Sequence, residues 1–283
     1  MTLGRTAVVT DSTAYLPDGL ALARGIGVVS LQVVFGSTSG DEGVDVLPAQ
    51  VAAALTERRG TVTTSRPAPA RFVEAYLATG ADSIVSVHLS GRLSGTVDAA
   101  LIAAQEVAER GISVRVVDSQ TVAMGLGFAV LAAAAQAMSG ADLSTVEHCA
   151  VSAAQRTKTY FYVDTLEFLR RGGRIGAAAA LFGTALAVKP LLQVREGQIA
   201  PLEKVRTVSK ALARLEQLAV EEAGDAPVDI AVHHLAAPDR AGAMAARLRE
   251  RVPGLGELSL SEVGAVVGAH VGPGLLGVVI AHR

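Results

Sequence analysis

The stretch SIVSVHLSGRLSGTVDAALIAAQEVAERGISVRVVDS, residues 83–119, decides the fold of this chain. It begins with a run rich in β-branched residues, passes through a loop with two glycines, and continues as an alanine-rich segment that ends at Gly111. A second β-branched run follows at 113–118. The two runs predict buried strands and the segment between them predicts a helix. A strand, a helix and a strand in this order favour a parallel sheet.

The same alternation continues on both sides of this stretch. TAVVT at 6–10 predicts a first buried strand, and Pro69 or Ala70 opens the predicted helix ARFVEAYLATG. Between them, residues 39–45 are expected to form a polar loop and residues 61–69 a turn-rich linker. GLGFAVLAAAAQAMSGA predicts another helix further on. We therefore expect an N-terminal, mostly parallel α/β domain over residues 1–155.

The pattern changes after residue 155, where strand-like runs outnumber helices. REGQ at 195–198 has the composition of a hairpin turn between two of these runs. We therefore expect a C-terminal α+β domain over 156–283 with a mixed or antiparallel sheet. The strand-like runs are TYFYV, LLQV, GQIAPLEKV, DIAVHHL, ELSLSEVG and LLGVVIA.

The composition argues against several classes of protein. Half of the residues are hydrophobic, the net charge is −2, and aromatic residues make up 4% with no Trp. A nucleic-acid-binding protein usually shows a basic face or stacking aromatic residues, and this chain is short of both. The single cysteine, Cys149, rules out an internal disulfide and fits a reducing cytoplasm. The composition therefore predicts a cytoplasmic protein that does not bind nucleic acid.

Two apolar stretches raise the question of a membrane span. IGAAAALFGTALAV, residues 175–188, is too short to cross a bilayer. Residues 263–281 are long enough, but they contain His270, Pro273 and several glycines and are expected to form two buried strands around a loop. The N-terminus meets Asp11 too soon for a signal peptide. No membrane span is predicted.

Two loops combine small hydroxyl residues with the start of a helix. HLSGRLSGT, residues 88–96, contains Ser94, Gly95 and Thr96, and TTSRPAP, residues 63–69, contains Thr64 and Ser65. The free N–H groups of a helix N-terminus favour an anion. Ser94 does not lie in the G-x-S-x-G pattern, and no Gly-Lys-Ser/Thr is present. The loops favour anion binding over covalent catalysis; the alternative is that their hydroxyls only turn the chain and cap helices.

Asp11 follows the first predicted strand, as does the nucleophile of haloacid-dehalogenase-type phosphatases. That chemistry needs a second aspartate two residues later as general acid, and Thr13 stands there. A structural role is favoured, in which Asp11 and Ser12 order the loop through side-chain to backbone hydrogen bonds. The enzymatic alternative is a hydrolase or phosphotransferase that uses Asp11 or Ser94.

His270 lies among four glycines in VGAHVGPGLLG, which suggests that some group approaches the backbone closely there. It is a candidate donor to an anion, although a lone histidine is often a satisfied core residue. The other histidines lack zinc-type spacing, and no metal is expected. A basic cluster contains Arg170, Arg171 and Arg174, with Lys204 and Arg206 further on. It is either a basic surface for a phosphate or an acidic partner, or a solvated helix face paired with Glu167 and Glu203.

Together these motifs resemble the DegV family of bacterial fatty-acid-binding proteins. They occur in the family's order from residue 8 to residue 277, so the resemblance covers nearly the whole chain. The matching segments are VVTDSTAYLP, TTSRPAP, LSGRLSGTVDAA, VVDSQTVAMGLG, DTLEFLRRGGRI, KPLLQVREGQIAPLEKVRT and GAHVGPGLLG.

The resemblance implies a two-domain DegV-like α/β fold that binds one long-chain fatty acid, such as palmitate, between the domains. Its carboxylate would be held by Thr64 and Ser94 with His270 close by. The protein would have no cofactor and no catalytic activity of its own, and would present the carboxylate to a separate fatty acid kinase. Arg206 would serve kinase docking, helped by Arg170 and Arg174. Two departures from the family pattern are Arg66, where glutamine is frequent, and Arg92.

Overall fold

The computed structural model describes residues 6–35, 38–57, 61–181 and 189–283. The chain forms two compact units. The first comprises residues 1–32 and 65–155, and the second comprises residues 33–64 and 156–283. Within the described residues, none of the helices combines the length and hydrophobicity that a membrane crossing requires.

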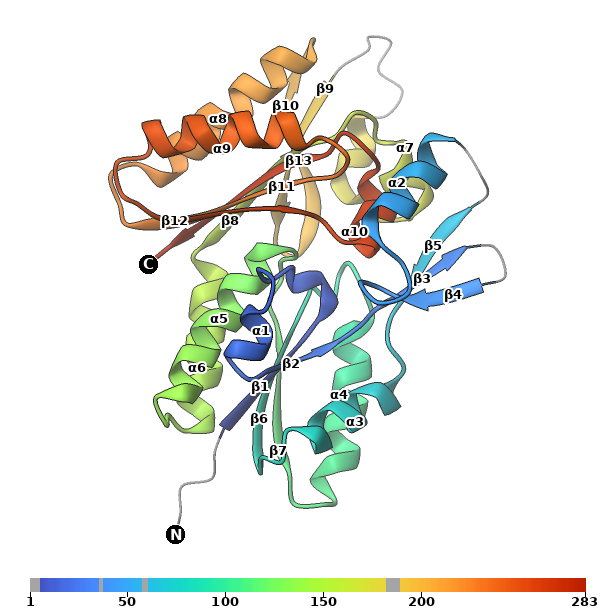
Figure 1. Ribbon diagram of the computed structural model, residues 1–283, viewed down its shortest axis with the longest axis vertical. Helices are drawn as coiled ribbons and strands as arrows, with labels where there is room; N and C mark the ends of the chain where they lie inside the picture. Colours follow the sequence, from blue (N-terminus) through green and yellow to red (C-terminus); the bar gives the residue numbers. More distant parts are fainter. Residues whose placement is uncertain (1–5, 36–37, 58–60, 182–188) are drawn as a thin grey trace. The chain divides into compact units, whose positions relative to one another are not determined.

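The first unit is built on a parallel sheet in the order β2-β1-β6-β7 (Figure 1). Its two central strands, β1 and β6, are buried nearly throughout because helices cover both faces of a parallel sheet. The strands are β1 (Thr6–Asp11), β2 (Ile26–Val29), β6 (Ser83–His88) and β7 (Ser113–Asp118).

Two pairs of helices pack on this sheet. Helices α3 and α4 contribute Phe72, Tyr76 and several alanines to one apolar cluster with β1, β2 and β6, whereas α5 and α6 pack together and contact β1, β6 and β7 (Figure 1). The helices are η1 (Ser12–Ala14), α1 (Leu20–Ala23), α3 (Pro69–Ala78), α4 (Thr96–Ala108), α5 (Met124–Met138) and α6 (Leu143–Gln155). The strand–helix–strand expectation for residues 83–119 is confirmed, as is a helix that opens at Pro69.

The second unit is built on a mixed sheet in the order β10-β9-β8-β13-β11-β12. Only β11 and β12 pair in parallel; the other neighbours are antiparallel. The predicted hairpin turn is confirmed, since Glu196 and Gly197 both have positive φ between β9 and β10. The strands are β8 (Thr157–Tyr162), β9 (Lys189–Arg195), β10 (Gln198–Val205), β11 (Val228–His234), β12 (Leu255–Glu262) and β13 (Leu276–His282).

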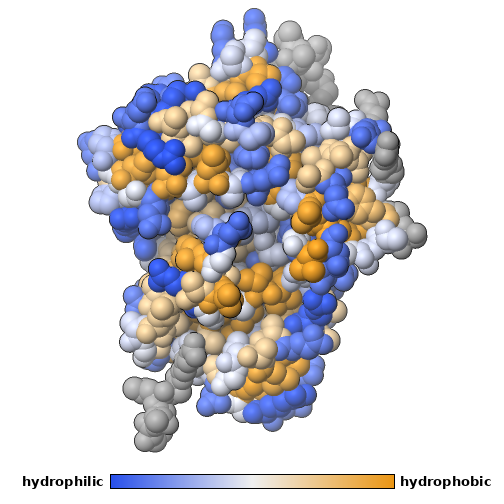
Figure 2. Space-filling model, viewed as in Figure 1, coloured by the Kyte–Doolittle hydropathy of each residue, from blue (hydrophilic) through white to orange (hydrophobic). Residues whose placement is uncertain are grey.

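Helices α8 (Val208–Ala223) and α9 (Pro238–Arg251) cover one face of the mixed sheet (Figure 1). Their apolar residues join one core cluster with β8, β11 and β13. Hydrophilic residues are spread over the outer surface of these helices in Figure 2. This division between an apolar and a polar face is what anchors an amphipathic helix on a sheet.

The second unit also contains the helix α10 (Ala265–Val271). Helix α10 contacts α2 (Pro48–Thr56) and α7 (Glu167–Arg171), and the N–H of Val266 donates to Glu42 Oε1 at 2.7 Å. The other elements are the 3-10 helix η2 (Gly176–Leu181) and a three-stranded sheet in the order β4-β3-β5, formed by β3 (Gln32–Phe35), β4 (Thr38–Asp41) and β5 (Val62–Ser65).

The structure differs from the sequence-based expectations in three places. Residues 33–64, expected in the N-terminal domain, cluster with the second unit. The expected polar loop and turn-rich linker contain strands β4 and β5. Residues 265–271 are helical rather than a strand, because packing against α2 and α7 overrides the β propensity of valine. The apolar stretch 175–188 begins with η2, and its residues 182–188 lie outside the described residues.

Candidate functional site

Thr64 and His270 form a hydrogen-bonded pair within the second unit. Thr64 lies on β5 and His270 lies on α10, and 2.8 Å separates Thr64 Oγ1 from His270 Nε2. The two residues are 206 positions apart in the chain. The second unit therefore brings together two of the three residues predicted to bind a carboxylate.

The surroundings of His270 select one tautomer of its ring. Its Nδ1 is buried and has no hydrogen-bond partner among the described residues. A buried N–H without a partner costs about 1–3 kcal/mol, so the proton is favoured on Nε2. Nε2 then donates to Thr64 Oγ1, and the hydroxyl proton of Thr64 is left for another acceptor. The pair thus offers a neutral donor of the kind that suits an anion.

Arg174 supplies a positive charge near this pair. Its Nη1 donates to the backbone oxygen of Gly172 at 2.6 Å. Burial, and to a lesser extent the charge of Arg174, lower the pKa of His270 to about 4. At neutral pH the imidazole is therefore uncharged, and the positive charge belongs to the guanidinium. We expected Arg174 in partner docking, and the structure adds an electrostatic link to His270.

Glycines around His270 make room for side chains of the same unit. A Cβ on Gly172 would overlap His270 Nδ1, and a Cβ on Gly272 would overlap the ring of Phe168. Gly272 also has a φ of +75°, which disfavours any other residue. The sequence suggested a close approach to the backbone here. The groups that approach are the chain's own side chains.

Ser94 lies in the first unit, just before α4. Its Oγ is 2.8 Å from Thr96 Oγ1, and its N–H donates to the Ser90 oxygen at 3.1 Å. The guanidinium of Arg66 occupies the space that a Cβ on Gly95 would need. Ser65 is exposed and donates to the Arg66 oxygen at 3.2 Å. Of the residues predicted with Ser94, Thr96 is its hydrogen-bond partner and Gly95 follows it directly, whereas Ser65 contacts Arg66.

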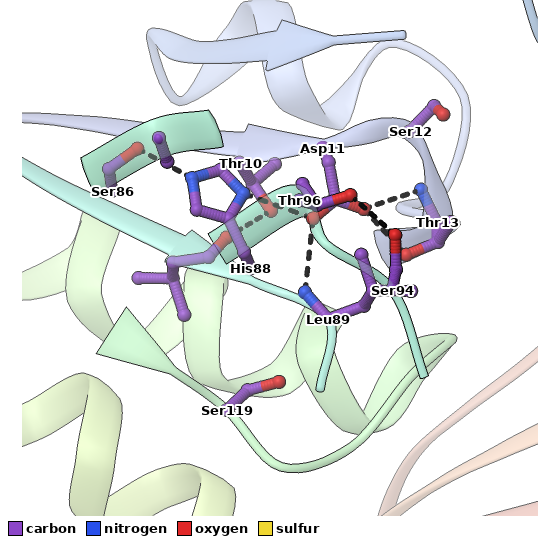
Figure 3. Close-up of polar contacts among 12 residues, drawn as sticks. Thr10, Asp11, Ser12, Thr13, Ser86, His88, Leu89, Ser94, Thr96 and Ser119 are labelled. Atoms are coloured by element: carbon purple, nitrogen blue, oxygen red, sulfur yellow. Dashed lines mark hydrogen bonds and ion pairs between the residues drawn. The ribbon is translucent and has the colours of Figure 1, made fainter. Parts of the chain in front are cut away.

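Asp11 is fully buried at the end of β1, as the structural interpretation of its motif required. Its carboxylate accepts from the N–H of Thr13 and of Leu89 and from His88 Nδ1 (Figure 3). A carboxylate enclosed by donors has no free face for a phosphoryl group. Across the described ranges, no cluster of three His, Cys, Asp or Glu side chains is placed to hold a metal ion.

Ser86 and His88, which connect to Asp11, were not predicted from the sequence as functional residues. Ser86 and His88 lie two positions apart on β6 and therefore point to the same face of the sheet, where both are fully buried. The alternation of polar residues in SIVSVH was the available signal. Asp11, which is hydrogen-bonded to His88, lies on β1 at a distance of 77 positions in the sequence, so no local pattern links the two residues.

The basic residues of the second unit differ in their partners. Arg170 and Arg171 both pair with Glu167, at 2.9 and 2.7 Å, as the solvated-face alternative proposed. Glu203 pairs instead with Arg214, at 2.8 Å. Arg206 is exposed directly after β10, and no ion pair joins it to another described residue.

A parallel α/β unit and a mixed-sheet unit, with a hydroxyl–imidazole pair in the second, define a two-unit α/β protein whose candidate site carries neutral donors. The chain belongs to the DegV family. The family's model, described as "Uncharacterised protein, DegV family", matches residues 5–283. A DegV domain-containing protein of Streptomyces coelicolor is 59% identical over 280 residues, which cover 98% of each chain.

Two solved structures of the family share the fold. One carries the description "Fatty Acid Binding of a DegV family Protein from Thermus thermophilus"; it is 32% identical with a TM-score of 0.92 and covers 99% of this chain and 100% of its own. The other is DegV, "a fatty acid binding protein from Bacillus subtilis". It is 33% identical with a TM-score of 0.90 and also covers 99% of this chain and 100% of its own. The expected family and fold class are confirmed.

The lowered pKa of His270 predicts a pH-dependent loss of stability. Between pH 6.5 and about 4 the unfolded chain binds a proton on this imidazole that the folded chain does not, so the free energy of unfolding falls as pH falls. The loss attributable to His270 between pH 7.5 and 5 is about 2 kcal/mol. Urea unfolding of wild type and of His270→Gln at both pH values measures it. Equal pH dependence of the two proteins would contradict the assignment.

Gly172→Ala is expected to separate His270 from Thr64, because the added methyl group overlaps His270 Nδ1. Overpacking of this kind costs about 1–3 kcal/mol, seen as a lower melting temperature. The matched control is Gly242→Ala in α9, where a Cβ meets nothing within 4 Å. The control should keep or raise the melting temperature. A crystal structure of Gly172→Ala with the pair intact would refute the expectation.

Proposed function

We propose that this protein binds a long-chain fatty acid and presents its carboxylate to a separate fatty acid kinase that forms the acyl phosphate. The observation that carries the proposal is the Thr64–His270 pair, which leaves a hydroxyl proton for an acceptor. Membership of the DegV family supports it, as do the family members from Thermus thermophilus and Bacillus subtilis whose descriptions name fatty acid binding. The protein itself would carry no catalytic activity.

The carboxylate would be held by neutral donors. Thr64 would donate its hydroxyl proton, His270 would orient that hydroxyl from behind, and Ser94 would supply a second hydroxyl. Arg174, which bonds a backbone oxygen, would add positive potential without an ion pair. A carboxylate that is not neutralised by a cation keeps its electron density for attack on a phosphoryl group, which suits transfer by a kinase.

The acyl chain would supply most of the affinity. Each buried methylene group contributes roughly 0.8 kcal/mol, so a chain of palmitate length needs little from its headgroup. The polar groups of the site then need only to orient the carboxylate, and a few hydroxyl donors are enough for that.

Docking of the kinase would use basic residues of the second unit. Arg206 is the best placed for a charged contact because it is exposed and joined to no described residue by an ion pair. Arg170 is bound to Glu167, so a partner carboxylate would have to compete with that ion pair. A cytoplasmic location accords with the lone cysteine.

The enzymatic alternative finds less support. Asp11 is enclosed by its own donors, and the partner found for Ser94 is the hydroxyl of Thr96 rather than a base. A nucleophilic serine needs a base within hydrogen-bond reach. We therefore prefer the binding function.

The binding proposal predicts that fatty acid co-purifies with the protein and that Thr64→Val weakens its rebinding. A hydrogen bond to a charged group contributes about 1.5–3 kcal/mol, so the loss should be roughly 10-fold or more. Ser94→Ala should also weaken binding while the fold stays intact. Native mass spectrometry with organic extraction, followed by titration with palmitate, measures both effects.

The matched control for Thr64→Val is Thr63→Val, which makes the same change on the exposed face of β5. This control should bind as wild type does. An absence of acyl ligand together with no binding of added palmitate would refute the proposal.

Arg206→Ala is expected to leave palmitate binding unchanged and to lower the rate of kinase-dependent acyl phosphate formation. The reason is that its exposed guanidinium is proposed to contact the kinase rather than the lipid. Arg195→Ala, which removes an exposed arginine paired with Glu196 at the β9–β10 turn, serves as control. Equal phosphorylation rates for wild type and Arg206→Ala would rule out this docking role.

A further inference from the structure

A chain of hydrogen bonds runs through the interior of the first unit. The Tyr76 hydroxyl donates to Ser86 Oγ at 2.9 Å, Ser86 Oγ lies 2.7 Å from His88 Nε2, and His88 Nδ1 lies 3.0 Å from Asp11 Oδ2. Figure 3 shows the part from Ser86 to Asp11. All four side chains are fully buried. A buried series of hydrogen bonds like this one is costly in desolvation free energy unless every polar group in it has a partner.

One assignment of protons satisfies the whole chain. Tyr76 donates to Ser86, Ser86 donates to His88 Nε2, and His88 donates from Nδ1 to Asp11. Every donor then points towards the carboxylate. The ring of Phe72 packs edge-on against His88, with 5.0 Å between the ring centroids. The order Asp–His–Ser matches that of a hydrolase triad, but the buried Ser86 cannot meet a substrate.

The carboxylate of Asp11 also contacts the segments that follow β1 and β6. Its Oδ1 accepts from the N–H and the hydroxyl of Thr13, at 3.1 and 2.5 Å. Its Oδ2 accepts from the N–H of Leu89 at 3.0 Å, in addition to His88. Leu89 is the first residue after β6. Asp11 therefore fixes the point at which the chain leaves the sheet.

The loop that starts at Leu89 ends at Ser94. The N–H of Ser90 donates to Thr121 at 2.9 Å, and Gly91 donates to Asp118 Oδ1 at 3.2 Å. The N–H of Ser94 returns to the Ser90 oxygen at 3.1 Å. The position of Ser94 thus depends on Ser90, which is held by Thr121 and directly follows Leu89.

The other end of the buried chain reaches the helix that follows Ser94. The Tyr76 hydroxyl lies 3.5 Å from the backbone oxygen of Ala100 in α4. Helix α4 begins at Thr96, which is hydrogen-bonded to Ser94. The series of buried hydrogen bonds therefore reaches both Leu89, where the Ser94 loop begins, and α4, which follows it.

We infer that Asp11 and His88 are positioning residues, which set Ser94 for the fatty-acid carboxylate through the backbone N–H of Leu89. The inference rests on the proposed function, and it assigns a role to a motif that resembles an enzyme's nucleophile.

The test uses Asp11→Asn and His88→Gln in the full chain. An asparagine at position 11 turns an NH2 group towards one of the groups that donate to the carboxylate, so at least one hydrogen bond is lost. The matched controls are Asp142→Asn, which changes an exposed aspartate that accepts from Thr145 N–H, and His148→Gln, which changes an exposed histidine of the same unit. Both controls should match wild type. Ser86→Ala is a milder third variant if the first two fail to fold.

Two readouts are expected to change. In ligand-free protein, amide hydrogen exchange over residues 89–94 should accelerate at least 10-fold, while exchange in α5 and α6 stays unchanged. The dissociation constant for palmitate should rise at least 10-fold. Combination with Ser94→Ala should give little further loss, because the positioning residues act through Ser94.

A role limited to stability would lower the melting temperature and leave palmitate affinity and local exchange as in wild type. That outcome overturns the inference, as do additive losses in the double variant. Failure of wild type to bind palmitate would refute the proposed function instead. The exchange measurement in ligand-free protein would then decide the inference alone: acceleration over 89–94 supports it, and unchanged exchange overturns it.

Discussion

A carboxylate enclosed within a protein must be surrounded by donors, and in the first unit this requirement falls on Asp11. Its two oxygens accept from Thr13 in the 3-10 helix η1 after β1, from His88 on β6, and from Leu89 in the loop after β6. The ends of two adjacent strands are therefore joined by one charged group. The loop that carries Ser94 and the start of α4 depend on that junction, because the removal of a single donor leaves a buried charge incompletely compensated.

His88 and His270 show contrasting hydrogen-bonding arrangements. Both nitrogens of His88 have partners within the first unit, so its hydrogen-bonding capacity is used up. His270 has a partner only at Nε2 among the described residues, and its other nitrogen is buried without one. A complete network stabilises a fold, whereas a buried polar atom without a partner needs an explanation, of which a functional role is one. This contrast separates a structural histidine from a candidate site histidine within one protein.

Much of the fold could be predicted because the local pattern agreed with the tertiary structure. The stretch 83–119 forms β6, α4 and β7, Pro69 opens α3, and the REGQ turn joins two antiparallel strands. The expectation failed at residues 265–271, where valines suggested a strand. Contacts with α2 and α7 stabilise a helix there, and such contacts are not encoded in the local sequence. The membership of residues 33–64 in the second unit likewise depends on packing between segments that are distant in the sequence.

The sequence by itself determined the family, the two types of sheet and the residues able to donate to an anion, since these follow from the order of motifs and from side-chain chemistry. The tertiary structure decided which of these residues meet. It joined Thr64 to His270 and Asp11 to His88 across 206 and 77 positions. It also enclosed Asp11 and left one nitrogen of His270 with no hydrogen-bond partner among the described residues. The physical reason is that hydrogen bonds between distant residues depend on how strands and helices pack, whereas propensity and periodicity act over only a few positions.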